Sequence, residues 1–148
     1  MFGKLHVRVR SAKLTRDTEI FGQMDPYCLL TIGGQKEKTK VHKKGGKKPR
    51  WDQEFSFVCK GEEEMLVDCF DEDTFKKDDL VGTGLIQLNA VLNGSYNGKV
   101  IIYYKKKSAG ELYIDLEFTP VKVESSLLKF SKAICYGVMN YPNLKKNK

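Results

Sequence analysis

Residues 4–10 read KLHVRVR, and this stretch decides the fold because its side chains alternate between apolar and polar. In an extended strand successive side chains point to opposite faces, so Leu5, Val7 and Val9 would share one face. The basic residues between them would share the other. The same alternation returns at residues 111–118, ELYIDLEF. Both stretches therefore predict strands with one buried and one solvent-facing side.

Six further strand-like runs lie between these two stretches. They are YCLLTI (27–32), EKTKVH (37–42), EFSFVC (54–59), EMLVDCF (64–70), GLIQL (84–88) and KVIIYY (99–104). The segments that separate them are rich in Gly, Asp, Asn and Lys, as turns and loops are. Eight short strands with turn signals between them predict an all-β chain, folded as an eight-stranded antiparallel β-sandwich.

The pattern changes after Pro120. Residues 125–141, SSLLKFSKAICYGVMNY, place apolar residues at steps of three and four, which predicts a short helix with one apolar stripe. We therefore divide the chain into a sandwich domain, residues 1–122, and a C-terminal extension, residues 123–148, that is helical and then basic. The helix would pack on the sandwich or contact a membrane or partner.

Composition limits the class of protein. The chain has 148 residues, 41% of them hydrophobic, so we expect one folded domain. Nothing approaches the ~20 apolar residues of a membrane span, and the first residues do not resemble a signal peptide, so we expect a soluble, cytoplasmic protein. The net charge of +7 suggests an anionic partner without identifying it. Cys28, Cys59, Cys69 and Cys135 show no metal-binding spacing and are expected to be reduced.

An acidic cluster interrupts this basic chain. Residues 71–79 read DEDTFKKDD and hold five acids in nine positions. Asp71 and Asp73 would point the same way from an extended segment, and a loop that folds back would bring Asp79 towards them. Carboxylates this close repel one another unless a cation lies between them. Calcium suits oxygen ligands around an irregular loop. A solvated acidic loop is the other interpretation.

Two other acidic motifs do not fit. An EF-hand counted from Asp71 would need Gly at its sixth position and Glu at its twelfth, where the chain has Lys76 and Gly82. The phosphatases with an aspartate nucleophile carry D-x-D-x-[TV], and Phe75 occupies the last position here. Their parallel α/β core is also absent from the strand pattern of this sequence.

A second acidic segment, RDTEIFGQMDPYC (16–28), contains Glu19 and Asp25. The chain resembles the C2 domain, a calcium-dependent membrane-targeting module, in five segments: EIFGQMDPY, KEKTKV, KPRWDQEFSF, LVDCFDEDTFKKDDLVG and GELYIDLEF. The resemblance covers roughly residues 2–120 with the motifs in order, and the layout looks closest to small stand-alone plant-type C2 proteins. It implies the C2 sandwich in its second topology, in which the strand that opens the first topology closes the domain.

The resemblance also implies a set of calcium ligands. Matched position by position, they are the side chains of Glu19, Asp25, Asp71, Asp73 and Asp79, with the backbone carbonyl of Glu72 as an extra ligand. Asp79 fits the spacing better than Asp78.

Two positions depart from the family. The family usually has Asp where Glu19 stands, with Asp17 as a substitute candidate. Lys76 stands where some relatives place a hydroxyl ligand for an additional ion, so at most two calcium ions are expected.

Membrane contact would use two further groups of residues. Ile20, Phe21 and Phe75 lie among the ligands at loop tips, where apolar side chains have little core to join, so they are candidates for membrane insertion. Lys36, Lys38 and Lys40 alternate along one predicted strand. In related domains such a face binds phosphoinositide headgroups, and Tyr27 and Phe70 could flank one here.

The leading interpretation is a calcium-dependent phospholipid-binding module, recruited from the cytoplasm to anionic membranes. The alternative is a calcium-independent adaptor or phosphoinositide-binding domain. The sequence contains no recognisable Ser/His/Asp or Cys/His catalytic set, so no catalysis is expected. Binding to a protein partner is a further open alternative. Nucleic-acid binding is not expected, since no aromatic residues are interleaved with the lysines.

Overall fold

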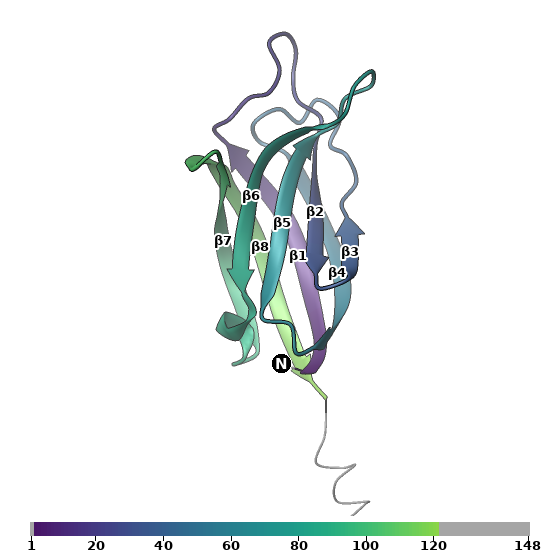
Figure 1. Ribbon diagram of the computed structural model, residues 1–148, viewed down its shortest axis with the longest axis vertical. Coiled ribbons are helices and arrows are strands. Elements are labelled where there is room, and N and C mark those ends of the chain that lie inside the picture. Colours follow the sequence, from purple (N-terminus) through teal and green to yellow (C-terminus); the bar gives the residue numbers. More distant parts are fainter. Residues whose placement is uncertain (1, 122–148) are drawn as a thin grey trace, which may run out of the picture.

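The computed structural model describes residues 2–121, which form eight strands and one short 3-10 helix (Figure 1). The strands are β1 (Phe2–Leu14), β2 (Pro26–Ile32), β3 (Gln35–Lys38), β4 (Arg50–Lys60), β5 (Glu64–Asp71), β6 (Asp79–Gln87), β7 (Ser95–Tyr104) and β8 (Lys107–Pro120), with η1 (Leu88–Val91) after β6. The helix predicted at residues 125–141, the basic tail and Cys135 lie outside the described residues.

All strands pair antiparallel, in the order β3-β2-β5-β6-β7-β8-β1-β4. β6 and β7 are joined by the single registered pair Thr83–Tyr103, so the order divides there into two four-stranded layers. Figure 1 shows the two layers facing each other. The predicted all-β antiparallel sandwich is confirmed.

The closing strand β8 is an inner strand that pairs with β1 on one side and β7 on the other. This is the arrangement expected of the second C2 topology. The two ends of the described chain lie side by side, because the Val121 N–H donates a hydrogen bond of 3.1 Å to the Phe2 carbonyl. Both residues lie at the end of the sandwich opposite the long loops after β1 and β5 (Figure 1).

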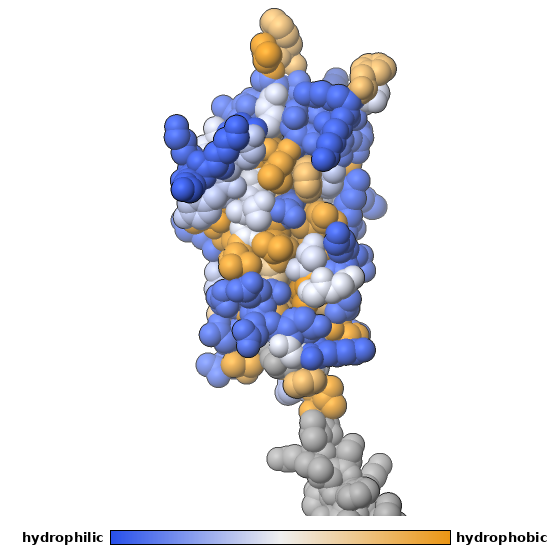
Figure 2. Space-filling model, viewed as in Figure 1, coloured by the Kyte–Doolittle hydropathy of each residue, from blue (hydrophilic) through white to orange (hydrophobic). Residues whose placement is uncertain are grey.

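The outer face of the β3-β2-β5-β6 layer carries apolar area as well as charge. Leu66 on β5 and Leu85 on β6 form a cross-strand pair and are 41% and 47% exposed. Tyr103 on β7 is 51% exposed beside them. Figure 2 shows apolar side chains in the middle of this face, with hydrophilic side chains around them.

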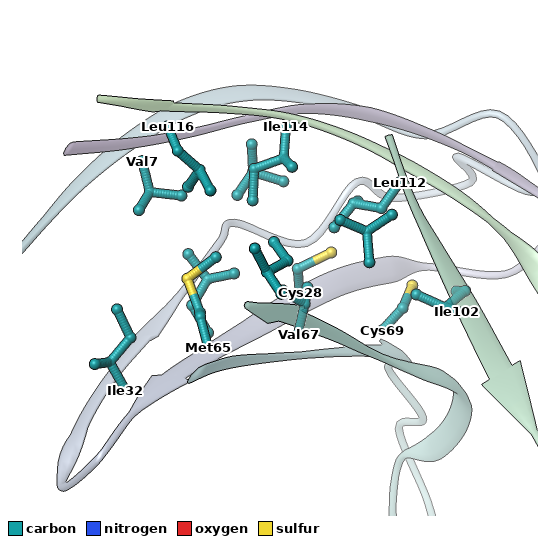
Figure 3. Packing of buried hydrophobic residues seen from close by; sticks show 14 of the residues in the cluster. Val7, Cys28, Ile32, Met65, Val67, Cys69, Ile102, Leu112, Ile114 and Leu116 are labelled. Atoms are coloured by element: carbon teal, nitrogen blue, oxygen red, sulfur yellow. The ribbon is translucent and has the colours of Figure 1, made fainter. Parts of the chain in front are cut away.

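The core lies between the two layers, and both contribute to it (Figure 3). Val7 from β1 and Leu112 and Ile114 from β8 face Met65 and Val67 from β5, all buried. The period-2 patterns at residues 4–10 and 111–118 thus bury the predicted faces.

The cysteines of the described chain behave as core residues. Cys28, Cys59 and Cys69 are buried free thiols. Burial raises the pKa of Cys28 and of Cys59, which keeps both thiols protonated.

The expected strand at residues 37–42 was wrong in its extent, because β3 ends at Lys38. Thr39 is 2% exposed, and its N–H still donates to the Cys28 carbonyl at 2.9 Å. The Cys28 N–H, however, donates to the Thr39 hydroxyl at 2.8 Å. Since a side chain replaces the backbone acceptor there, the ladder stops and the chain turns into the loop before β4. Several other strands, such as β1 and β7, are longer than predicted.

Replacement of this hydroxyl should weaken the fold. Thr39→Val keeps the shape of the side chain but leaves the buried Cys28 N–H without an acceptor, which costs about 1–3 kcal/mol. We expect urea unfolding to show a loss of that size in the free energy of unfolding. Thr31→Val, on β2 and half-buried, is the matched control and should change it by less than about 0.5 kcal/mol. Equal effects of the two variants would contradict the role of the hydroxyl.

The turn between β7 and β8 has only two residues, Lys105 and Lys106, and both adopt left-handed backbone with φ of 47° and 67°. Two positive φ values are typical of the type I′ hairpin turn, which favours Asn-Gly. Left-handed backbone costs a residue with a side chain about 1–2 kcal/mol. The chain therefore carries two lysines at a tip where its backbone geometry favours other residues.

Candidate functional site

Two loops at one end of the sandwich bring the predicted acidic residues together. One loop, residues 15–25, joins β1 to β2, and the other, residues 72–78, joins β5 to β6 (Figure 1). Their roots are adjacent because Asp71 at the end of β5 pairs with Pro26 on one side and Asp79 on the other. The Glu72 N–H also donates to the Asp25 carbonyl at 3.0 Å.

Asp71 ties the first loop to the sheet. Its side chain is fully buried, which for a carboxylate requires hydrogen bonds. One oxygen accepts the Asp25 N–H and the other accepts the Thr18 hydroxyl, both at 2.7 Å. Asp71 thus has a structural role in addition to any role as a ligand. Thr18 was missed from the sequence, where nothing distinguishes it from other loop threonines.

Glu19, and not Asp17, lies against the acidic cluster. A hydrogen bond with Asp71 raises the pKa of Glu19, and burial and the charges of Asp71 and Asp73 raise it further. The Asp17 carboxylate instead accepts the Glu19 N–H at 3.0 Å and is exposed. The longer side chain therefore reaches the cluster while the shorter acid caps the loop.

Asp73 is the least satisfied carboxylate of the site. Its side chain is 11% exposed, and its buried Oδ2 atom accepts no hydrogen bond. Removal from water raises the pKa of Asp73, and the nearby Asp79 and Asp71 raise it further against the opposing effect of Lys76. A buried carboxylate oxygen that accepts no hydrogen bond and lies among other carboxylates is a position that a cation would stabilise.

Two lysines lie among the acids: Lys76, which the sequence placed at a ligand position of the second loop, and Lys43, which was not predicted there. The Lys76 ammonium lies 2.9 Å from Asp79 and 3.8 Å from Asp73. Its hydrogen bond lowers the pKa of Asp79 and raises that of Lys76. Lys43, from the β3–β4 loop, lies 2.7 Å from Glu72 and 3.8 Å from Asp25. Each lysine holds a pair of carboxylates as a local counter-ion.

Asp78 makes different contacts from its neighbour Asp79. Its carboxylate accepts the Tyr27 hydroxyl and the Asp73 N–H. The Tyr27 hydrogen bond lowers the pKa of Asp78, while burial and the same bond raise that of Tyr27. Asp78 therefore fixes the loop from outside the acidic cluster.

The two loops enclose an open cleft of 810 Å³. Its lining includes Glu19, Asp25, Glu72, Asp73, Lys43 and Lys76. Within residues 2–121 no three His, Cys, Asp or Glu side chains are close enough to form a ready-made metal site. The donor set nevertheless fits a hard cation such as calcium, since all its donor atoms are oxygens and Asp73 Oδ2 accepts no hydrogen bond from residues 2–121. The two lysines must move aside for the carboxylates to close around an ion.

The predicted insertion residues project from the loop tips. Ile20 and Phe21 are 89% and 90% exposed, and Phe75 is 100% exposed. Figure 2 shows two separate apolar tips at the top of the molecule, where these loops end. None of the three folds back to close its own loop.

The predicted headgroup residues are brought together only in part. The rings of Tyr27 and Phe70 stack with centroids 5.5 Å apart, and the Lys38 ammonium lies 4.0 Å from the centroid of Tyr27. Lys36 is exposed on the same face of β3, whereas Lys40 lies beyond the end of the strand. Tyr27 itself is 7% exposed, so its ring positions the Lys38 ammonium and has little surface left to contact a headgroup.

Within the described range, 2–121, no helix has the length and apolar character required to cross a membrane.

Comparison with known proteins agrees with this architecture. The family model for the C2 domain matches residues 3–102. Elicitor-responsive protein 3 of Oryza sativa subsp. japonica is 33% identical over 121 residues, which cover 80% of this chain and 84% of that protein. A larger C2 and GRAM domain-containing protein of Arabidopsis thaliana is 32% identical over 78% of this chain, which spans 12% of its length.

Solved structures show the same fold. A C2 domain-containing protein from an elicitor-responsive gene superposes with a TM-score of 0.71 at 32% identity, covering 81% of this chain and 90% of the other. The calcium-bound pair of C2 domains from Extended-Synaptotagmin 2 reaches a TM-score of 0.70 at 23% identity, covering 88% and 52%. The family match, the plant relatives and the shared sandwich agree: this chain belongs to the C2 domain family.

Proposed function

We propose that this domain binds anionic phospholipid membranes in response to calcium. The ligands would be the side chains of Glu19, Asp25, Asp71, Asp73 and Asp79, with the Glu72 carbonyl as an extra ligand. The observation that carries the proposal is the buried Asp73 Oδ2, which accepts no hydrogen bond from residues 2–121 and has the Lys76 ammonium 3.8 Å away, in a cleft that other carboxylates line. A buried acceptor without a hydrogen bond needs an explanation, and a closely bound ion would supply one.

The charge of the site supports the same conclusion. Five carboxylates at one end repel an anionic membrane, and Lys43 and Lys76 offset only part of that charge. Two calcium ions, when bound, would nearly cancel the five negative charges and leave coordination positions for lipid phosphate oxygens. Asp71 holds the first loop beside the root of the second through its bonds to Thr18 and Asp25, so the remaining acids would converge from two loops that already lie together.

The apolar tips would strengthen docking. Ile20, Phe21 and Phe75 extend beyond the acidic cleft, so they would reach the membrane interface when lipid approaches the ligands. Burial of each phenylalanine ring would contribute on the order of 1–2 kcal/mol.

Calcium binding and vesicle binding should be measured together. Calorimetry should detect heat of calcium binding, and the midpoint of thermal unfolding should rise with calcium because the ion binds only the folded state. Sedimentation with phosphatidylcholine vesicles containing phosphatidylserine should require calcium and be reversed by EGTA. Sedimentation that is equal with calcium and with EGTA would contradict the proposal.

Removal of the internal ammonium should tighten calcium binding. Lys76→Gln removes the cation that competes for Asp73 and Asp79. Because the Lys76 side chain is 62% exposed, the pair is weak and the expected gain in calcium affinity is about two- to fivefold. Calorimetry checks it, with the exposed neighbour Lys77→Gln as the control for net charge. An equal gain in both variants, or no gain, would show that Lys76 does not compete.

A calcium-independent function has one observation in its favour. Lys38 over the Tyr27–Phe70 stack, beside the exposed Lys36, provides a basic position on the sheet face, away from the acidic cleft. A phosphoinositide headgroup or an acidic protein partner could bind there. If this is the main membrane site, Lys36→Ala with Lys38→Ala should abolish binding to phosphoinositide vesicles in EGTA. If the acidic cleft is the main site, the same variant should have only a modest effect on calcium-triggered sedimentation.

In this role the domain would act by binding, without catalysis. It would be cytoplasmic in resting conditions and move to the membrane when calcium rises. No nucleic acid is expected as a partner, since the acidic end would have no use in that role.

A further inference from the structure

A second cavity lies beside the turn between β7 and β8, separate from the acidic cleft and from the lysines of β3. It measures 370 Å³ and is lined by Thr15, Arg16, Tyr104, Lys105, Lys107, Ser108 and Ala109. This lining holds three cationic side chains, three side chains with a hydroxyl (Thr15, Tyr104 and Ser108) and no carboxylate. None of these cations forms an ion pair with the acids of residues 2–121.

Arg16 is fixed in place and still has free donors. Its guanidinium carbon lies 3.6 Å from the centroid of the Tyr104 ring, and its backbone N–H donates to the Ala109 carbonyl at 3.2 Å. Only one long hydrogen bond uses the head group, from Nη2 to the Leu80 carbonyl at 3.4 Å. The buried Nε atom has no partner. A planar, stacked guanidinium with unused donors is suited to oxyanions.

The lysines of the turn are held there against backbone preference. Lys105 and Lys106 both take left-handed φ values, which Asn and Gly would adopt more easily. The Lys105 ammonium lies 5.3 Å from the centroid of Tyr104, so it and Arg16 both contact one ring. Strained backbone that persists without a structural need is typical of functional sites.

We propose that this cavity binds a phosphate group, with Arg16, Lys105 and Lys107 as the charged contacts and the Thr15 and Ser108 hydroxyls as neutral ones. The turn lies at the same end of the sandwich as the acidic loops, and Figure 2 shows it as a hydrophilic projection beside the apolar tips. A membrane that meets those tips would also meet the turn. The site goes beyond the calcium-dependent function, because it needs no metal and its lining contains none of the calcium ligands.

The phosphate could belong to a lipid headgroup or to a soluble phosphate ester, and two titrations separate these sources. ¹H–¹⁵N spectra of the full chain in EGTA would be recorded with soluble inositol trisphosphate, and with phosphatidylcholine vesicles that contain a phosphatidylinositol monophosphate. We expect the amides of Thr15, Arg16 and Ser108 to shift or broaden. A response only to vesicles assigns the site to lipid, a response only to the soluble ester assigns it to that ligand, and a response to both shows shared recognition of phosphate.

A double variant separates binding from folding. Lys105→Asn with Lys106→Gly removes two charges and installs the preferred turn sequence, so the midpoint of thermal unfolding should rise. The affinity for the responding phosphate ligand should fall about tenfold. Lys4→Gln with Lys60→Gln removes the same charge at the opposite end of the sandwich, where the start of β1 pairs with the end of β4, and should have little effect.

Two results would overturn the site. One is a set of amide shifts confined to residues 36–48, with those of Thr15, Arg16 and Ser108 unmoved. The other is unchanged phosphate affinity in the turn variant. Because every measurement is made in EGTA, neither result bears on calcium binding, and loss of calcium-triggered sedimentation would leave this site intact.

Discussion

The variant Asp73→Asn should fail to sediment with phosphatidylserine-containing vesicles at calcium concentrations at which the unmodified protein sediments with them. Asp73 supplies a buried carboxylate oxygen in the cleft that accepts no hydrogen bond from residues 2–121 and lies 3.8 Å from the Lys76 ammonium, so the amide removes the charge at the point where an ion fits best. Loss of an outer-shell partner already weakens metal sites about 10- to 100-fold, and loss of a ligand should exceed that. Calorimetry should show calcium affinity reduced by more than about 100-fold.

The same variant should fold at least as well as the unmodified protein without calcium. Burial and the neighbouring acids raise the pKa of Asp73, so its ionised form opposes folding at neutral pH, and a neutral amide removes that effect. Asp17→Asn, in the other loop and outside the lining of the acidic cleft, makes the identical charge change and should retain calcium binding. If both variants lose calcium to the same degree, net charge and not a defined ligand is responsible. If Asp73→Asn unfolds, the site has been misassigned to function.

The double variant Phe21→Ser with Phe75→Ser should bind calcium normally in solution and yet bind vesicles poorly. Both rings are almost fully exposed and contact no core, so their removal should leave the fold and the ligands unchanged. At ~1–2 kcal/mol for each ring buried in the membrane interface, vesicle affinity should fall roughly 30- to 900-fold.

A matched control uses exposed apolar residues at the other end of the molecule. Phe2 and Leu92 are 63% and 56% exposed, and Phe2→Ser with Leu92→Ser should leave vesicle affinity unchanged. Sedimentation across a vesicle titration, together with calorimetric calcium binding in the absence of lipid, separates the two effects. Full vesicle affinity after loss of both rings would mean that the domain docks by another surface, such as the sheet face around Lys38.

Much of the fold could be predicted because period-2 patterns depend on local geometry alone. Leu112 and Ile114 had to share a face in any strand, and they are fully buried. The end of β3 could not be predicted in this way. Thr39 continues the alternating pattern, and only its pairing with Cys28 across the sheet shows that its hydroxyl ends the ladder.

The residues predicted for the site lie at one end of the sandwich, but most of their contacts could not be predicted. The spacing of Asp71, Asp73 and Asp79 around a hairpin was enough to bring them to one end of the sandwich. Lys76 stands between Asp73 and Asp79 in the sequence, but Lys43 as a counter-ion could not be foreseen, since it comes from a third loop whose path depends on tertiary packing. The choice of Glu19 over Asp17 likewise depends on loop geometry, because the path of the loop places Glu19 beside Asp71 while Asp17 accepts the Glu19 N–H.

The pairing of Phe2 with Val121 has a practical consequence for how this domain can be used. Neighbouring chain ends are what allow one domain to be spliced into a surface loop of another. A fluorescent reporter attached at Phe2 or at Val121 would lie at the opposite end of the sandwich from the acidic loops and leave the proposed docking surface unobstructed. Two reporters, one at each of these residues, would lie close together and form an energy-transfer pair whose signal reports unfolding rather than membrane contact.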